Sequence, residues 1–248
     1  IINRIHELGV KRIVFTGGDP LQRPDAPVLI EYAKAKGLET ALSTTGDYVT
    51  PKILKTIAPA LDLISLPLDG STELINARTK HPGHFSAVMR ALDWLREYPS
   101  IDVKVCTPVT RRNIGDVPNI ADLVEAYSQT TNARVFYNIF QALPRAMFSV
   151  RWEHLLVSDE MFTSLATQIG TGRNIRINFL SQQILDKLYV MVFPNGSMVI
   201  PRGSEYMNFG PFLEVEDFES VLESSQFDSV KHLRHSNGWG KTQVQNSS

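Results

Sequence analysis

The sequence contains one cysteine, Cys106, among 248 residues. This excludes an internal disulfide and any metal site that takes several cysteine ligands from these residues alone. We interpret Cys106 as a small buried apolar side chain in preference to a reactive thiol. Because structural disulfides mark oxidising compartments, a reducing, cytoplasmic location is the default expectation.

The sequence also lacks an excess of charge of either sign and any long apolar run. Its 25 Lys and Arg residues balance 26 Asp and Glu residues, for a formal net charge of -1. This balance gives no support to nucleic-acid binding, and the pair Arg111-Arg112 is too short to change that. No apolar run approaches the roughly 20 residues of a membrane-spanning helix. We therefore expect neither a nucleic-acid nor a membrane partner.

Common catalytic signatures are absent as well. The chain has no Gly-x-Ser-x-Gly nucleophile motif and no Gly-x-x-x-x-Gly-Lys phosphate loop. His81 and His84 could contribute to zinc binding only with further ligands nearby, so we interpret them as part of a solvated turn. His232, His235 and Trp239 are expected to pack on the surface, with a lid over the site as the alternative.

What the sequence does contain is a repeated pattern of a short apolar strand followed by an amphipathic helix. The predicted strands are Arg12–Thr16, Thr40–Thr44, Leu63–Leu68, Val103–Val109 and Arg134–Phe140. Helices are predicted between them at 26–36, from Pro51, along the stripe Phe85, Val88, Leu92 and Leu95, and at 120–128. This alternation predicts an α/β fold with a parallel sheet and outer helices, and functional residues at the carboxyl ends of the strands.

Both ends of the chain depart from this pattern. Residues 1–9 form an apolar helical stripe without an initiator Met, which we interpret as truncation of a longer chain. After Pro144 the pattern predicts a helix Ser158–Ile169, a strand Arg176–Leu180, a hairpin Leu188–Ile200 and a short helix Asp217–Leu222. The predicted domains are a partial barrel (1–145), a C-terminal extension (146–240) and a disordered tail (241–248).

The sharpest local signal is a strand that runs into two glycines, an acid and a proline: Ile13-Val14-Phe15-Thr16-Gly17-Gly18-Asp19-Pro20. Two glycines allow a tight turn and leave the backbone polar groups bare for a ligand. The carboxylate of Asp19 beside them can bind the ammonium group of an amino acid. A plain βα turn explains these residues equally well on their own.

This run resembles the GGEP motif of the radical S-adenosylmethionine (SAM) family, with Asp19 where most members have Glu. The residues that follow it, Leu21-Gln22-Arg23-Pro24-Asp25, resemble the continuation of that motif. In the family this motif binds the amino group of the methionine part of SAM. The resemblance therefore assigns Gly17, Gly18, Asp19 and Pro20 to SAM binding.

Further matches follow in the family's order on successive strand ends. Ser43-Thr44-Thr45-Gly46 resembles a T/S-N-G turn, which implies that Ser43 and Thr45 lie near the sulfonium and ribose of SAM. Leu66-Pro67-Leu68-Asp69-Gly70 resembles the SLDG run, with Pro67 in place of Ser, and Arg78 falls where the family has an Arg that faces the SAM carboxylate.

The last two strands match more loosely. Thr107-Pro108-Val109-Thr110-Arg111-Arg112-Asn113 resembles the N-x-V-x-x-x-N run of the fifth family strand, which assigns Asn113 to SAM; Cys106 stands where Asn is usual. Phe140-Gln141-Ala142-Leu143-Pro144 resembles the end of the sixth strand, which places Gln141 on the substrate side.

The resemblance implies a partial (β/α)6 barrel that lacks its first βα unit, and a [4Fe-4S] cluster held by a C-x3-C-x2-C loop expected upstream of Ile1. A full-length enzyme would cleave SAM reductively to a 5′-deoxyadenosyl radical, which abstracts hydrogen from a small-molecule or peptide substrate. Flavodoxin or ferredoxin would donate the electron. The alternative is a degenerate, non-catalytic barrel that binds SAM, a nucleotide or a protein partner.

The C-terminal extension bears on the subgroup of the family, and one lysine bears on the alternative of an unrelated lyase or aldolase. Tyr189–Pro201 resembles the PDGxVxPC hairpin of auxiliary-cluster extensions, but Arg202 stands where Cys is expected, so no auxiliary cluster is expected in these residues. The order of elements is closer to viperin-like or molybdenum-cofactor-type relatives. An unrelated α/β-barrel lyase or aldolase would need a catalytic lysine, and Lys104, the only strand lysine, is predicted to point outward.

Overall fold

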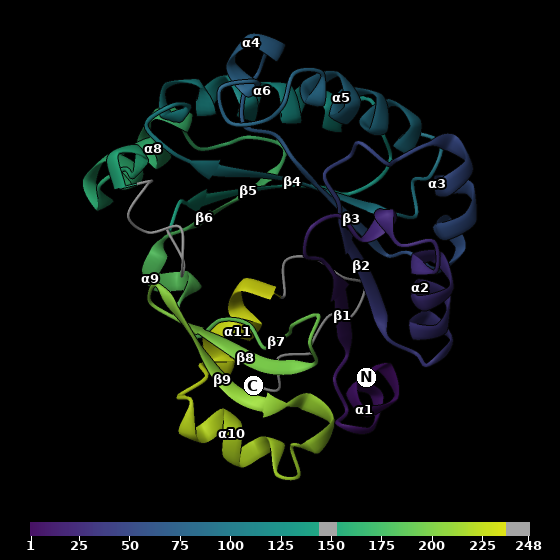
Figure 1. Cartoon of the computed structure of the whole chain (residues 1–248). Helices are drawn as coiled ribbons and strands as arrows, with labels where there is room; N and C mark the ends of the chain where they lie inside the picture. The colour runs from purple at the N-terminus through teal and green to yellow at the C-terminus, as the bar shows by residue number, and fades with distance from the viewer. Residues whose placement is uncertain (144–152, 237–248) are drawn as a thin grey trace.

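A curved, six-stranded parallel sheet forms the centre of the molecule (Figure 1). The computed structural model describes residues 1–143 and 153–236. In sheet order, the strands are β1 (Arg12–Phe15), β2 (Glu39–Ser43), β3 (Leu63–Pro67), β4 (Asp102–Val109), β5 (Val135–Gln141) and β6 (Arg176–Leu180). Each of the five strands predicted for the barrel agrees with β1–β5 to within one residue at each end. The predicted α/β class with a parallel sheet is confirmed.

Helices cover the convex face of this sheet (Figure 1). They are α2 (Ala26–Ala35), α3 (Pro51–Ile57), the short α4 (Glu73–Asn76), α5 (His84–Leu95), α6 (Val117–Ser128) and α8 (Asp159–Ile169), whereas the N-terminal helix α1 (Ile2–Glu7) lies beside the extension. Local sequence explains where several begin, because Thr50 and Ser158 accept backbone hydrogen bonds from Ile53 and Met161 at the starts of α3 and α8. The predicted helices from 26, 51 and 158 are confirmed.

The main core lies between the sheet and these helices. On β4 the side chains of Val103, Val105 and Val109 are fully buried in this core, together with Val88 and Val124 from α5 and α6. Because successive strand residues point to opposite faces, the alternate residues of each strand face the concave side. One face of the sheet is thus sealed by helices and the other faces the extension (Figure 1).

Strand β6 differs from the expected domain organisation. The sequence pattern assigned Arg176–Leu180 to the extension, but the strand pairs in parallel with β5, from Phe136 opposite Arg176 to Phe140 opposite Leu180. A parallel pair needs a long crossover, and α8 provides it by packing against α6. Arg173 bridges Asp122 and Glu125 of α6 and fixes the end of this crossover. The parallel sheet therefore continues beyond the expected boundary at residue 145.

The extension contains a three-stranded antiparallel sheet, β7 (Met191–Val192), β8 (Ser197–Arg202) and β9 (Glu205–Pro211), with helices α9 (Gln182–Leu185), α10 (Phe218–Ser224) and α11 (Ser229–Ser236). The predicted hairpin is confirmed, and Gly196 supplies the positive φ of +84° that its turn needs. The structure adds β9 and α11, which the sequence pattern did not predict. His232, on α11, hydrogen-bonds to the Leu188 carbonyl oxygen at 2.8 Å.

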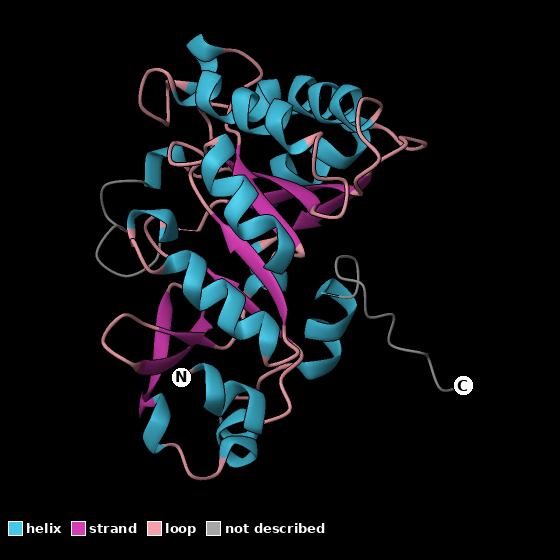
Figure 2. Cartoon of the chain, turned by 90° about the vertical axis from the view of Figure 1, so that its right-hand side faces the viewer, coloured by secondary structure: helices cyan, strands magenta, loops and turns pink. Residues whose placement is uncertain are grey.

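The extension packs against the N-terminal helix. Met198, Ile200 and Phe212 form a small second core, onto which Ile5 and Leu8 pack from the start of the chain. The Arg4 guanidinium also donates a 3.0 Å hydrogen bond to the Val215 carbonyl oxygen. Figure 2 shows the extension and α1 together at one end of the molecule, away from the outer helices. The first and last parts of the described chain thus stabilise each other.

Two further expectations concern membranes and the tail. Within 1–143 and 153–236, the structure contains no helix that is both long and apolar enough to cross a membrane. Trp239 and the tail 241–248 lie outside the described residues, as does Pro144.

Candidate functional site

The loop after β1 presents bare backbone beside a buried carboxylate. Gly17 and Gly18 have φ of +92° and +55°, a region that L side chains rarely adopt, and a Cβ at either position would meet no heavy atom within 4 Å. Both glycines are exposed, whereas Asp19 is buried and caps the short 3-10 turn that begins at Pro20. The motif therefore offers open space next to the Gly17-Gly18 backbone.

The Asp19 carboxylate is engaged by the protein's own donors. It accepts hydrogen bonds from the Leu21 amide at 2.9 Å, the Thr44 hydroxyl at 2.8 Å, and the amide and hydroxyl of Thr45 at 2.9 and 2.5 Å. These bonds tie the loop after β1 to the loop after β2, which explains how residues 25 positions apart are brought together. Asp19 is thus placed to hold the two loops, and the accessible part of the motif is the glycine backbone.

Ser43 and Thr45 lie at the carboxyl end of β2 but have different environments. Thr45 donates to Asp19, so its hydroxyl proton is used within the protein. Ser43 is half-buried, and its hydroxyl makes no hydrogen bond to another residue in the described ranges. Of the two predicted SAM contacts on this strand, Ser43 therefore has the hydroxyl available for a ligand.

Two buried asparagines hold the loops after β3 and β4, and Asn113 links one loop to the other. The Asn76 side chain accepts a 2.9 Å hydrogen bond from the Asp69 amide, and Asn113 donates to the carbonyl oxygens of Asp69 and Pro108 at 3.1 and 3.0 Å. Asn113 also accepts from the Thr110 amide at 2.8 Å. The structure places the predicted SAM ligand Asn113 inside this network, with a side chain that holds loops together.

Beneath this network two buried polar groups each have an atom without a partner. Within the described part of the chain, neither Asp69 Oδ1 nor His84 Nε2 makes a hydrogen bond. The other carboxylate oxygen of Asp69 accepts from the Thr79 hydroxyl at 2.9 Å and faces Lys80 at 3.6 Å. Burial raises the pKa of Asp69, a shift that Lys80 partly opposes, and burial lowers the pKa of His84. The expectation of a solvated turn is wrong for His84, which is 1% exposed because it begins α5 inside the fold.

The lowered pKa of His84 leads to a prediction about acid stability. A histidine that resists protonation in the folded state stabilises the fold above its unfolded pKa of 6.5, and this contribution is lost as the pH falls below that value. His84→Gln removes this loss, so we expect the variant to be less destabilised than the wild type between pH 7 and pH 5. Urea unfolding at the two pH values measures the difference.

His81→Gln is the matched control for that measurement. A hydrogen bond to Asp47 and another to the Pro82 carbonyl oxygen raise the pKa of the exposed His81. Its contribution is therefore present below pH 6.5 and lost as the pH rises, so His81→Gln should change the pH dependence in the opposite direction. If the free energy of unfolding changed equally between pH 7 and pH 5 for the wild type and for His84→Gln, the lowered pKa of His84 would be contradicted.

The last two predicted site residues, Arg78 and Gln141, differ in their exposure. Arg78 is exposed. Its guanidinium donates to the Arg112 carbonyl oxygen at 3.4 Å, and the Arg112 guanidinium donates to the Arg78 carbonyl oxygen at 2.8 Å. Gln141 is 2% exposed; its amide donates to Asp159 at 2.7 Å and accepts from the Gln182 amide at 3.1 Å. Arg78 is thus accessible to an anion, whereas Gln141 fixes α8 and α9 to the end of β5.

Two residues of β4, Lys104 and Cys106, lie on the concave face, and for Lys104 this is contrary to expectation. Lys104 was predicted to point outward, but its neighbours Val103 and Val105 face the helices, so the lysine faces the inner side of the curved sheet. Cys106 shares that face and is half-buried, with its sulfur 3.2 Å from the Ser65 hydroxyl. The signal for this orientation was present in the sequence, in the alternation of valines with Lys104 and Cys106.

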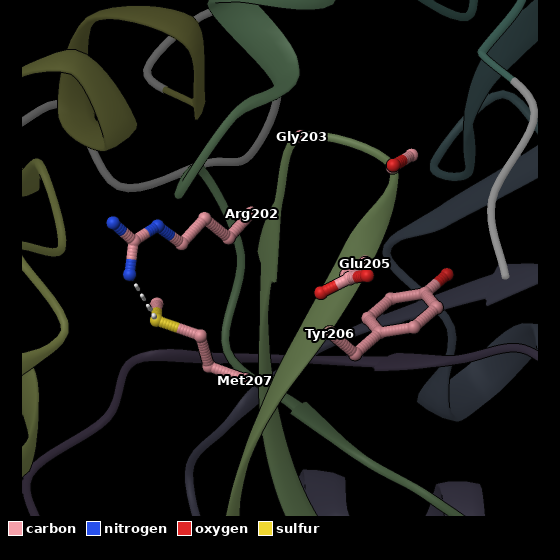
Figure 3. A pocket seen from close by; sticks show the side chains of 6 residues that line it. Arg202, Gly203, Glu205, Tyr206 and Met207 are labelled. Carbon is pink, nitrogen blue, oxygen red and sulfur yellow. Dashed lines mark hydrogen bonds between the residues drawn. The ribbon is translucent and has the colours of Figure 1, made fainter.

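A separate pocket of about 410 Å³ lies on the β8–β9 hairpin (Figure 3). It is lined by six consecutive residues, 202–207, with Arg202 directed towards the sulfur of Met207 at 3.8 Å. None of these residues belongs to the carboxyl edge of the parallel sheet, so the pocket is not part of the candidate site.

Comparison with characterised proteins gives relatives that match a little more than half of the chain. The mycofactocin maturase MftC of Mycobacterium ulcerans is 32% identical over 132 residues, which are 52% of this chain and 36% of the maturase. The AdoMet-dependent heme synthase of Nitratidesulfovibrio vulgaris is 32% identical over 146 residues, 58% of this chain and 38% of the synthase. The chain thus spans little more than a third of the length of these relatives.

Solved structures resemble nearly the whole chain in fold. Native anSMEcpe with bound AdoMet matches 93% of this chain and 72% of its own, with a TM-score of 0.64 and 13% identity. Streptococcus suis SuiB bound to S-adenosylmethionine matches 95% of this chain and 59% of its own, with a TM-score of 0.63 and 13% identity. The model of the radical SAM superfamily matches residues 1–124, half of the sequence, and includes the carboxyl ends of β1 to β4 described above. The chain belongs to the radical SAM superfamily.

Proposed function

We propose that this chain forms the SAM-binding part of a radical SAM enzyme, with the methionine end of SAM at the carboxyl ends of β1 and β2. The observation that supports this most is the exposed, positive-φ backbone of Gly17 and Gly18, with open space where side chains would be. Carbonyl oxygens in such a turn can accept hydrogen bonds from an ammonium group. Asp19 holds this turn against Thr44 and Thr45.

The residues of this chain fit SAM but not an iron–sulfur cluster. The chain has one cysteine, and within the described ranges no three His, Cys, Asp or Glu side chains gather where they could hold a metal ion. The three cysteine ligands typical of the family would have to come from residues outside these 248. When bound together, SAM and a reduced [4Fe-4S] cluster supply a 5′-deoxyadenosyl radical that abstracts hydrogen from substrate.

The chain's own residues bind and orient SAM in this proposal. Gly17 and Gly18 accept from its ammonium group, the Ser43 hydroxyl binds near its ribose, and the Arg78 guanidinium faces its carboxylate. Asp19 and Asn113 act indirectly, because their hydrogen bonds hold the loops that carry these groups. The extension faces the concave side of the sheet.

For the substrate class we propose a peptide, with flavodoxin or ferredoxin as the electron donor. Two solved structures that resemble the chain over its barrel and its extension contain a peptide. They are SuiB bound to precursor peptide SuiA, with a TM-score of 0.57, and anSMEcpe with bound AdoMet and Kp18Cys peptide, with a TM-score of 0.63. A maturase is among the sequence relatives. The extension that this chain shares with those neighbours supports the proposal.

The test uses the full-length gene product, reconstituted anaerobically with iron and sulfide. We expect 5′-deoxyadenosine after addition of SAM and dithionite, and we expect SAM to bind with a Kd that Ser43→Ala raises about threefold to tenfold, as for loss of one hydrogen bond. Ser86→Ala, on the outer helix α5, is the control and should leave both unchanged. If the reconstituted protein assembles no cluster and forms no 5′-deoxyadenosine, the chain is a non-catalytic binding barrel and the proposal is rejected.

A further inference from the structure

The loops after β3 and β4 carry three exposed arginines, Arg78, Arg111 and Arg112. Their guanidinium groups donate to backbone carbonyl oxygens. Arg78 and Arg112 donate to each other's carbonyl oxygen. Arg111 donates to that of Leu156 at 2.9 Å. In the described ranges, none of the three forms an ion pair with a carboxylate. A carbonyl oxygen fixes an arginine without neutralising its charge, so three positive charges remain at this surface.

The acidic side chains around these loops do not cancel this charge. Asp69 is buried and faces Lys80 at 3.6 Å. Asp116 is buried and accepts hydrogen bonds from the loop after β3, and Glu73 accepts from the backbone at the start of α5. Glu153 is exposed and is one carboxylate against three guanidinium groups. The surface therefore has net positive charge and complements an anionic partner.

The arginine charges are spread along the surface rather than gathered at one point. The hydrogen bonds between Arg78 and Arg112 cross, so each guanidinium lies at the backbone of the other residue. Arg111 is held towards the segment that leads to α8. Leu74 on α4, one helical turn before Arg78, is 78% exposed and adds an apolar side chain. Separated charges with an apolar residue suit the surface of a protein, because a small anion would need donors that converge on it.

We call Leu74, Arg111 and Arg112 the arginine surface, which adjoins the proposed SAM site. Arg112 donates to the Arg78 carbonyl oxygen at 2.8 Å, and Arg78 is the residue proposed to face the SAM carboxylate. Helix α4 projects at the end of the molecule opposite the extension (Figure 1). A partner on this surface would lie next to the methionine end of SAM and would leave the side that faces the extension to the substrate.

We propose that the arginine surface docks the acidic protein that donates the electron for SAM cleavage, a flavodoxin or a ferredoxin. This inference rests on the proposed function, because it assigns a surface to the partner named there. Flavodoxins and ferredoxins carry an excess of carboxylates at their surfaces. Opposite charges on two proteins speed their association and orient them. In the step that follows docking, the carrier loses one electron and the [4Fe-4S] cluster gains it.

The test uses the reconstituted full-length protein and measures how fast flavodoxin hydroquinone and reduced ferredoxin each support 5′-deoxyadenosine formation. Dithionite is the comparison, because it reduces the cluster without a docked protein. With the faster carrier below saturation, we expect Arg111→Gln/Arg112→Gln to be about tenfold slower and Leu74→Ser about threefold slower. With dithionite, both variants should keep the wild-type rate. Higher salt should slow the carrier-driven rate of the wild type towards that of the double variant.

Arg90→Gln is the matched control, since it removes one exposed positive charge from the outer helix α5. It should leave both rates unchanged. A double variant as fast as Arg90→Gln with the protein carrier, or a wild type that neither carrier reduces, would overturn the inference. So would a double variant that is equally slow with dithionite, since its defect would then lie in SAM binding. Failure of the wild type with dithionite rejects the proposed function itself, whereas the other outcomes reject only the docking surface.

Discussion

Asp19→Ala is expected to lower the stability of the barrel by about 3 kcal/mol or more and to abolish measurable SAM binding. The substitution leaves the amides of Leu21 and Thr45 and the hydroxyls of Thr44 and Thr45 without their acceptor. Each buried donor left unsatisfied costs about 1–3 kcal/mol, and only some of these donors can find water. The loop that carries Gly17 and Gly18 loses its tie to β2, so the ligand-facing backbone is no longer held.

Thermal unfolding and SAM titration measure the two effects. For a protein of this size, a loss of about 3 kcal/mol corresponds to a fall in Tm of roughly 6–12 °C. Asp25→Ala is the control, because it removes an exposed carboxylate from the same loop, one that pairs with Arg23. That variant should melt with the wild type and bind SAM normally. A wild-type Tm for Asp19→Ala would refute the central role of this carboxylate.

Gly70→Ala is expected to have the second largest effect, through steric overlap in the loop after β3. A Cβ at Gly70 would lie 2.3 Å from the Asn76 nitrogen and 2.7 Å from the Ile75 carbonyl carbon. These are backbone atoms of α4, so the helix must move. Overpacking of this kind costs about 1–3 kcal/mol and occasionally more. The shift would break the hydrogen bond from the Asp69 amide to Asn76 and displace Arg78, two residues further on.

Gly115→Ala is the matched control for this prediction. Gly115 lies in the loop after β4, and a Cβ there meets no heavy atom within 4 Å. We therefore expect Gly115→Ala to retain the Tm and the SAM affinity of the wild type. Gly70→Ala should have a lower Tm and a weaker affinity for SAM. Similar melting of the two variants would show that α4 can move without cost and would contradict the packing argument.

The local structure and the family could be predicted from the sequence. Helix starts depend on residues within one turn, such as Thr50 and Ser158, and short-range patterns record them. Short runs rich in apolar and β-branched residues, separated by amphipathic helices, predict strands, and they located β1 to β5 to within one residue. The Gly17-Gly18 turn was recognisable because its positive φ values require glycine, and with the later strand ends it pointed to the radical SAM superfamily.

The accessibility of the predicted site residues depends on tertiary contacts. Asp19 and Asn113 were predicted to bind SAM, but contacts from residues far along the chain, Thr44 and Thr45 for one and Asp69 for the other, use their polar atoms. Sequence patterns do not record such contacts, because they depend on which loops the sheet order brings together.

The same reason explains the other corrections. Residues 176–180 look like an isolated strand until the α8 crossover places them beside β5, and β9 forms only because β8 offers it an edge. Lys104 and Arg176 lie 72 positions apart, yet the register of β4, β5 and β6 brings both to the concave face of the sheet, in one row with Phe136. Alternation along a strand shows that two sets of residues face opposite ways, and only the packed helices determine which set faces the core.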